Sequence, residues 1–162
     1  MIFKKKIKSL NSLEQVIAVL KKNGKKIVFT NGCFDLIHYG HVTYLEQAKK
    51  QGDVLVVGLN SDASVRKLKG KTRPVVCEKE RAGVLASLQS VDYVVIFGQD
   101  TPLKVIKKLN PDVLIKGSDW KNENIVGADH LASYGGKVKR ARFIEGCSTT
   151  QLLKKIVKTK YL

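Results

Sequence analysis

Short apolar runs of strand length alternate with longer amphipathic stretches along most of this chain. Most of the runs are continuously apolar, as expected of strands that are buried on both faces of a sheet. The predicted strands cover residues 26–30, 54–59, 93–97, 113–116 and 138–144, and the predicted helices cover residues 12–23, 42–51, 78–89, 102–109, 125–134 and about 148–158. This alternation predicts an α/β fold, namely a Rossmann-like doubly wound parallel sheet of about five strands with flanking helices.

The size and composition of the chain are typical of one globular domain. It has 162 residues, of which 43% are hydrophobic and 27% are charged, so we expect a single domain over residues 1–162. Its core is predicted at about residues 25–158, and residues 1–24 form an N-terminal extension with one helix. No apolar run approaches the roughly 18 residues of a membrane span, and the basic start lacks the apolar stretch of a secretion signal.

The three cysteines indicate a reducing compartment. They are odd in number and far apart, at Cys33, Cys77 and Cys147, and this spacing is typical of neither a zinc site nor a disulfide framework. We therefore expect a cytoplasmic protein.

The formal net charge of +16 suggests an anionic partner, and nucleic acid is the partner that composition alone favours. The basic residues are scattered, however, and only 7% of the residues are aromatic, which leaves little for stacking on bases. We expect no nucleic-acid partner, although a basic nucleic-acid-binding module remains the alternative from a different class.

A loop with a glycine and two histidines follows the first predicted strand, at residues 30–41. Gly32 permits a close backbone approach, and the helix that follows offers free amides to a phosphate. In a doubly wound sheet, ligands bind where the carboxyl ends of the strands meet such loops. The segment therefore predicts an anion-binding site.

His38 and His41 are three residues apart at the start of that helix, so both imidazoles can face one side, with Gly40 leaving space for a ligand. Two such donors would stabilise the charge that develops on a phosphoryl group during its transfer. In the simpler alternative, each histidine only caps the helix or bonds a carbonyl. A zinc site lacks further ligands, because His130 is distant and no cysteine has a suitable spacing.

The segment resembles the signature of the cytidylyltransferase-like nucleotidyltransferases, His-x-Gly-His after a Gly-x-Phe-Asp turn. The resemblance covers nearly the whole chain from residue 25. It continues at residues 60–64, 68–70, 73–75, 80–81, 100–102, 116–120 and 145–150.

Within that family the motifs are most similar to those of the adenylyltransferases of ADP-heptose synthesis. This similarity implies that AMP passes from ATP, with Mg²⁺, to D-glycero-D-manno-heptose 1-phosphate and that pyrophosphate is released, for lipopolysaccharide or surface-glycan precursors. It also implies a separate kinase, no membrane partner and a possible homodimer. The glycerol 3-phosphate cytidylyltransferases are similar too and stay as an alternative that uses CTP, although they carry an arginine where this chain has Phe143.

The resemblance also assigns site residues. The catalytic residues it implies are His38, His41, Lys69 and Arg81. The nucleotide-binding residues it implies are Asn31, Gly32, Cys33, Phe34, Gly40, Lys116, Gly117, Ser148 and Thr149. The substrate-binding residues it implies are Asp35, Asp62, Asp119 and Trp120, with no metal held by a dedicated protein site.

Simpler roles stay open for several of these residues. Lys69 is expected in a loop over residues 66–71, where it is either a phosphate contact or a solvated lysine, and Arg81 is either a phosphate contact or part of a surface ion pair. Ser148 and Thr149 are also competent helix caps. Asp35 and Asp62 either bind magnesium or hold their own loops, and Trp120 either stacks on substrate or closes a lid.

Overall fold

A five-stranded, entirely parallel sheet forms the centre of the computed structural model, which describes residues 1–117, 125–141 and 146–159. The strands are β1 (Ile27–Gly32), β2 (Val54–Asn60), β3 (Tyr93–Phe97), β4 (Val113–Gly117) and β5 (Lys137–Ala141). Their spatial order is β3-β2-β1-β4-β5. Strands β2 and β3 thus lie on one side of β1, and β4 and β5 lie on the other, so the switch point of the sheet is between β1 and β4. This topology confirms the predicted Rossmann-like fold.

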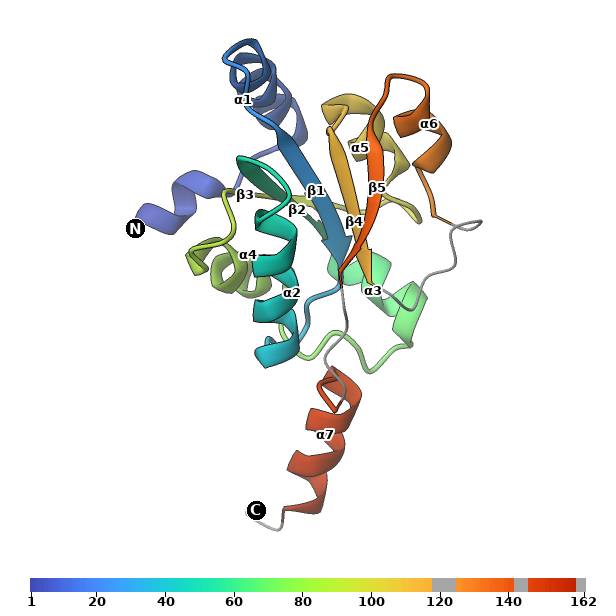
Figure 1. The fold of residues 1–162 in the computed structure, drawn as a ribbon. Coiled ribbons are helices and arrows are strands. Elements are labelled where there is room, and N and C mark those ends of the chain that lie inside the picture. Colours follow the sequence, from blue (N-terminus) through green and yellow to red (C-terminus); the bar gives the residue numbers. More distant parts are fainter. Residues whose placement is uncertain (118–124, 142–145, 160–162) are drawn as a thin grey trace.

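Helices cover both faces of the sheet (Figure 1). One face packs against α2 (Tyr39–Lys49) and α4 (Glu78–Ser87), and the other against α1 (Leu10–Lys22), α5 (Leu103–Leu109) and α6 (Ala128–Ala132). Successive residues of β1 serve opposite faces, because Val28 packs with the α2 side while Ile27 and Phe29 pack with the α1 side. Burial on both faces explains why the central strands are continuously apolar.

Two helical segments were absent from the sequence prediction, α3 (Asp62–Lys69) and the 3₁₀ helix η1 (Ile2–Lys6). The loop predicted over residues 66–71 is therefore wrong at residues 66–69, which belong to α3. The Ser61 side chain caps α3 by accepting a hydrogen bond from the Ser64 amide at 3.2 Å. The charged sequence of α3 does not predict a helix, because the Ser61 cap and tertiary contacts determine its conformation.

The N-terminal extension packs along the outer edge of β3. The Lys8 amide donates to the Val94 carbonyl at 3.0 Å, and Ile7 forms a parallel bridge with the same residue. The Lys6 ammonium donates to the Val91 carbonyl at 2.7 Å, just after α4. The extension thus pairs part of an edge that would otherwise expose free backbone groups.

Three aspartates immediately before strands β2, β3 and β4 each hold the start of a neighbouring strand. Asp53 accepts from the Lys26 amide, Asp112 from the Ile27 amide and Asp92 from the Leu55 amide, at 2.6 to 2.8 Å. These three aspartates therefore supply acceptors for amides at the amino ends of β1 and β2.

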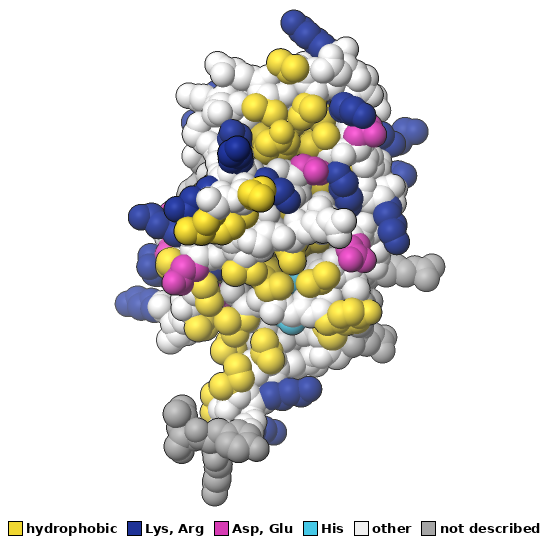
Figure 2. Space-filling model, turned by 90° about the vertical axis from the view of Figure 1, so that its left-hand side faces the viewer, with side chains coloured by type: hydrophobic (Ala, Val, Ile, Leu, Met, Phe, Trp, Pro, Cys, Tyr) yellow, Lys and Arg dark blue, Asp and Glu magenta, His cyan; other side chains and the backbone are white. Residues whose placement is uncertain are grey.

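The last helix, α7 (Thr149–Lys158), extends away from the sheet beyond the carboxyl ends of the strands (Figure 1). The Ser148 side chain caps it by accepting from the Gln151 amide at 3.2 Å, which confirms the capping role open to Ser148. Lysine and arginine side chains are spread over the face shown in Figure 2 without forming one band. Among the described residues, no helix combines the length and apolar character needed to cross a bilayer.

Candidate active site

A cavity of about 620 Å³ lies at the carboxyl ends of β1 and β4, at the switch point of the sheet. This volume is in the range of small-ligand sites. Its described lining comprises residues of the loop after β1, the strand ends, α3, the start of α5 and the turn before α7: Asn31, Gly32, Cys33, Phe34, Asp35, His38, Gly40, His41, Tyr44, Asn60, Leu68, Lys69, Arg73, Asp100, Thr101, Pro102, Lys116, Gly117, Val126, Cys147, Ser148, Thr149 and Thr150. A second hollow of about 700 Å³ between α1 and α5 is lined mainly by polar and lysine side chains, and its described lining contains neither histidine nor glycine.

The two signature histidines lie side by side on the wall of this cavity. Helix α2 begins at Tyr39, three residues earlier than predicted, so His38 is its N-cap and His41 lies in its first turn. Their rings stack with centroids 3.9 Å apart and an interplanar angle of 22°. The Nδ1 atoms of both rings are buried and have no hydrogen-bond partner among the described residues. These Nδ1 atoms thus face neither solvent nor a described partner, while both histidines contribute to the lining of the cavity.

Burial keeps this histidine pair uncharged. It lowers the pKa of His41 to about 4, with a further decrease from the neighbouring His38, while a backbone hydrogen bond with Leu36 acts in the opposite direction. Burial also lowers the pKa of His38. At neutral pH each free imidazole therefore offers one N–H donor and one acceptor nitrogen.

Two glycines shape the loop around the histidines. A Cβ atom on Gly32 would lie 3.0 Å from the Phe34 ring, and one on Gly40 would lie 2.9 Å from the Cβ of Cys147 and 3.1 Å from Nδ1 of His38. The space beside Gly40 is therefore filled by the His38 ring and the turn before α7, which differs from the open space for a ligand expected from the sequence. The glycine allows these two parts of the site to meet closely.

Polar side chains link the carboxyl ends of β1 and β4. The Lys116 ammonium donates to Oδ1 of Asn31 at 2.6 Å, and Lys116 is only 7% exposed. Behind them, the hydroxyls of Thr30 and Tyr44 share a hydrogen bond of 2.6 Å, and both lie within hydrogen-bond distance of the Ile115 carbonyl, at 3.1 and 3.2 Å. These contacts fix the floor of the cavity at the switch point.

Two cationic side chains reach the cavity from the segment after β2. Lys69 is the last residue of α3 and Arg73 follows in the next turn, and both lie in the lining. Burial raises the pKa of the nearby Cys33 thiol, against the opposing effect of Lys69 and Arg81. Cys33 is therefore a neutral wall residue, in agreement with a reaction that uses no thiolate.

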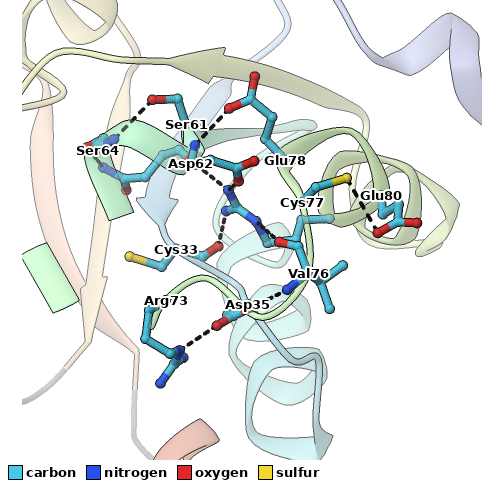
Figure 3. A network of polar contacts seen from close by, with 12 residues as sticks. Cys33, Asp35, Ser61, Asp62, Ser64, Arg73, Val76, Cys77, Glu78 and Glu80 are labelled. Atoms are coloured by element: carbon cyan, nitrogen blue, oxygen red, sulfur yellow. Dashed lines mark hydrogen bonds and ion pairs between the residues drawn. The ribbon is translucent and has the colours of Figure 1, made fainter. Parts of the chain in front are cut away.

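Arg81 is placed differently from the phosphate contact expected for it. It is 1% exposed and lies behind the loop after β1, where its guanidinium donates to four acceptors. Three are the carbonyls of Cys33, Asn60 and Val76, at 2.5 to 2.9 Å. The fourth is the Asp62 carboxylate at 2.7 Å, so the ion pair is buried instead of lying on the surface (Figure 3).

Asp35 lines the cavity, but its carboxylate points to the segment before α4. It accepts from Nε of Arg73 at 2.6 Å and from the Val76 amide at 3.0 Å (Figure 3). The Val75 amide donates to the same carboxylate at 2.9 to 3.0 Å. Burial opposes ionisation of Asp35, but the Val76 and Val75 amides and the Arg73 side chain outweigh it, so the pKa of this carboxyl is lowered. Asp35 thus ties the loop after β1 to the segment before α4, which differs from the hydrogen bonds to its own loop that the sequence left open.

The described residues offer no cage for a metal ion. They contain no group of three or more histidine, cysteine or acidic side chains arranged to hold one. Asp35 and Asp62, the two candidate magnesium ligands, are both occupied by arginine partners. Carboxylates that are paired with arginine in this way do not fit a dedicated magnesium site.

Most expected site residues are brought together, and some were missed. Thirteen of the seventeen line the cavity, Arg81 and Asp62 lie behind it, and Asp119 and Trp120 fall outside the described residues. The expectation overlooked several lining residues, among them Tyr44, Asn60, Arg73 and Asp100. The sequence contains a signal for two of them. Tyr44 lies three residues after His41 and therefore on the same face of the helix, and Asn60 is the last residue of an apolar strand.

The comparison with known protein families agrees with the geometry. The model of the family described as cytidylyltransferase-like matches residues 29–155. This chain belongs to the cytidylyltransferase-like family. The match includes the loop after β1, both histidines and the turn that begins α7, so the cytidylyltransferase-like assignment made from the sequence is confirmed.

Curated relatives extend the same relationship over almost the whole chain. The bifunctional protein HldE of Geobacter metallireducens is 58% identical over 153 residues, which is 94% of this chain and 31% of that protein. The bifunctional protein HldE of Campylobacter jejuni subsp. jejuni serotype O:6 is 56% identical over 154 residues, or 95% of this chain and 32% of its own length. This cytidylyltransferase-like chain thus spans about a third of the length of the curated relatives it matches.

Solved structures show the same fold. The lipopolysaccharide core biosynthesis protein from Thermoplasma volcanium has a TM-score of 0.62 and 30% identity, and the match covers 75% of this chain and 98% of that one. The pantoate-beta-alanine ligase from Francisella tularensis has a TM-score of 0.61 at 16% identity, covering 84% of this chain and 66% of the ligase. The second similarity supports the cytidylyltransferase-like fold alone.

Proposed function

We propose that this chain is an adenylyltransferase that transfers AMP from ATP to a sugar 1-phosphate and releases pyrophosphate. The observation that carries the proposal is the stacked pair of His38 and His41, whose rings lie on the wall of a cavity at the start of α2. Two imidazoles and a helix N-terminus that converge on one cavity suit a phosphoryl group whose charge increases in the transition state.

The reaction is an in-line displacement at the α-phosphorus of ATP. A phosphate oxygen of the acceptor forms the new P–O bond, and the bond to the leaving pyrophosphate breaks. His38 and His41 would hold the non-bridging oxygens as charge builds on them, while Lys69 and Arg73 would neutralise the polyphosphate from the other wall. Mg²⁺ is part of this proposal as the complex with ATP that enters the site.

The remaining walls supply sites for the two substrates. We assign the nucleotide to the loop after β1, to Lys116 and Gly117 at the end of β4, and to the turn at Ser148 and Thr149, all of which line the cavity. The placement follows the general rule for doubly wound sheets, in which ligands bind at the switch point.

The acceptor is proposed to be D-glycero-D-manno-heptose 1-phosphate, in the synthesis of lipopolysaccharide or surface-glycan precursors. The sequence motifs support this choice through their similarity to the ADP-heptose adenylyltransferases. The name of the Thermoplasma volcanium protein, lipopolysaccharide core biosynthesis protein, points to the same area of metabolism. A cytoplasmic location and a homodimer complete the proposal; all three cysteines are free, as a reducing compartment requires.

A matrix of nucleotides and acceptors tests this function. Pyrophosphate release is measured with ATP or CTP against heptose 1-phosphate, a hexose 1-phosphate and glycerol 3-phosphate. We expect the highest kcat/KM with ATP and the heptose. Turnover with CTP and glycerol 3-phosphate alone would favour the cytidylyltransferase alternative. No turnover together with tight, salt-dependent binding of DNA or RNA would favour the nucleic-acid-binding alternative.

A further inference from the structure

The loop after β1 contains a residue in an unfavourable backbone conformation directly beside the histidine pair. Phe34 has a φ of +42°, in the left-handed region that non-glycine residues rarely adopt, although it is 6% exposed and carries a large side chain. Such a conformation persists only where the surrounding structure imposes it. The contacts of the residues on either side of Phe34 provide this constraint.

Arg81 holds the residue before Phe34. Its Nη1 donates to the Cys33 carbonyl at 2.5 Å, and its Nη2 donates to the Asn60 carbonyl and the Asp62 carboxylate at 2.9 and 2.7 Å. The Arg81 side chain is completely buried. A buried guanidinium in four hydrogen bonds has a fixed position, so the Cys33 carbonyl is fixed with it.

Asp35 holds the residue after Phe34. Its carboxylate is 1% exposed and accepts from Arg73, Val75 and Val76. The two anchors share one residue, because the Val76 amide donates to Asp35 while the Val76 carbonyl accepts from Nε of Arg81 (Figure 3). Arg81 and Asp35 thus form one connected network on both sides of Phe34.

The backbone conformation of Phe34 determines where its ring lies. The ring packs over Gly32 and tilts against the His41 ring, with centroids 5.2 Å apart and an interplanar angle of 60°. His41 in turn stacks on His38. The Phe34 ring is therefore the contact through which the network reaches the histidines.

We infer that Arg81 and Asp35 are positioning residues, which hold Phe34 in its left-handed conformation so that its ring keeps His41 stacked on His38 at the cavity. The inference rests on the proposed function, because it takes the histidine pair as the centre of the reaction. In this inference Arg81 does not contact a phosphate but acts on the histidine pair through Cys33 and Phe34.

The inference differs from a purely structural role for Arg81 in one observable respect. If the network only stabilised the fold, its loss would lower the melting temperature and leave the environment of His41 unchanged. If it positions the Phe34 ring, its loss admits water to His41, which then protonates at a higher pH. The titration of His41 separates the two cases without any turnover measurement.

The experiment follows the His41 imidazole by NMR between pH 7.5 and 4.5 in the wild type, Arg81→Lys, Asp35→Asn and Phe34→Leu. Phe34→Leu removes the ring and leaves both anchors in place. The matched control is Asp92→Asn. Asp92 lies just before β3, away from the cavity, where it pairs with Lys49 and accepts a hydrogen bond from the Leu55 amide of β2, and the substitution weakens both contacts. Circular dichroism establishes that each variant is folded.

We expect His41 to stay mostly uncharged down to pH 4.5 in the wild type and in Asp92→Asn, because its pKa is about 4, and to protonate closer to its ordinary pKa of 6.5 in the other three variants. We also expect kcat to fall by about ten- to a hundredfold in Arg81→Lys and Asp35→Asn, as for misplaced catalytic groups. KM for ATP should change less than kcat, because the contacts assigned to Lys116, Gly117 and the turn at Ser148 and Thr149 remain.

Two results would overturn the inference. One is an unchanged His41 titration in folded Arg81→Lys or Asp35→Asn, even with a lower melting temperature. The other is an unchanged titration in Phe34→Leu. A wild-type protein that releases no pyrophosphate would refute the proposed function instead, and the NMR result would still decide whether the network positions His41.

Discussion

At the scale of single residues, burial of the His41 imidazole couples the stability of the protein to pH. In the native state its pKa is about 4, whereas in the unfolded chain it returns to 6.5. Between these values the unfolded chain binds more protons than the native protein, so the free energy of unfolding falls as the pH decreases. The contribution of His41 is fully present above pH 6.5 and is lost by about pH 4.

The prediction is that lowering the pH from 7.5 to 5 decreases the free energy of unfolding of the wild type by on the order of 2 kcal/mol more than that of His41→Asn. Urea denaturation at the two pH values measures both changes. Equal decreases in the two proteins would show that His41 is not buried uncharged in solution.

At the scale of elements, the aspartates before the strands stabilise the sheet by pairing amides of neighbouring strands. Asp112 accepts from the amide of Ile27, a fully buried residue, at 2.7 Å, whereas Asp53 accepts from the amide of Lys26, an exposed residue, at 2.8 Å. Water can replace Asp53 but not Asp112. A buried amide without a partner costs about 1–3 kcal/mol.

We therefore expect Asp112→Ala to lower the free energy of unfolding by about 1–3 kcal/mol and Asp53→Ala by less than about 1 kcal/mol. Both aspartates lie at the amino ends of the strands, so kcat should stay unchanged in both variants. Chemical denaturation and pyrophosphate release provide the two measurements, and equal losses of stability would contradict the role of burial.

The same scale shows what the sequence could reveal. Strands β1 to β4 were predictable because burial imposes apolar runs such as that of β2, whereas β5 is an edge strand with exposed lysine and arginine side chains. Helix α3 was not predictable, because its sequence is rich in charge and its conformation depends on the Ser61 cap and on the pairing of Asp62 with Arg81. That pair joins residues 19 positions apart, which no local pattern records.

At the scale of the whole molecule, the fold explains which parts of the candidate site the sequence could identify. His38 and His41 were identifiable because loops after parallel strands meet at one edge of the sheet, whereas Lys116 was assigned through the family resemblance. The direction in which a side chain points was not identifiable from the sequence. Arg81 has the charge of a phosphate ligand, and only the packing of α4 behind the loop after β1 shows that it faces the Cys33 carbonyl.

The measurement that tests the central claim most directly is the turnover of His38→Ala and His41→Ala with ATP and heptose 1-phosphate. Removal of one donor to the developing charge typically costs about a hundredfold to a thousandfold in rate. We predict a loss of kcat of this size in each variant, with circular dichroism spectra like that of the wild type. Rates close to the wild type in both folded variants would contradict the claim that this histidine pair carries out nucleotidyl transfer.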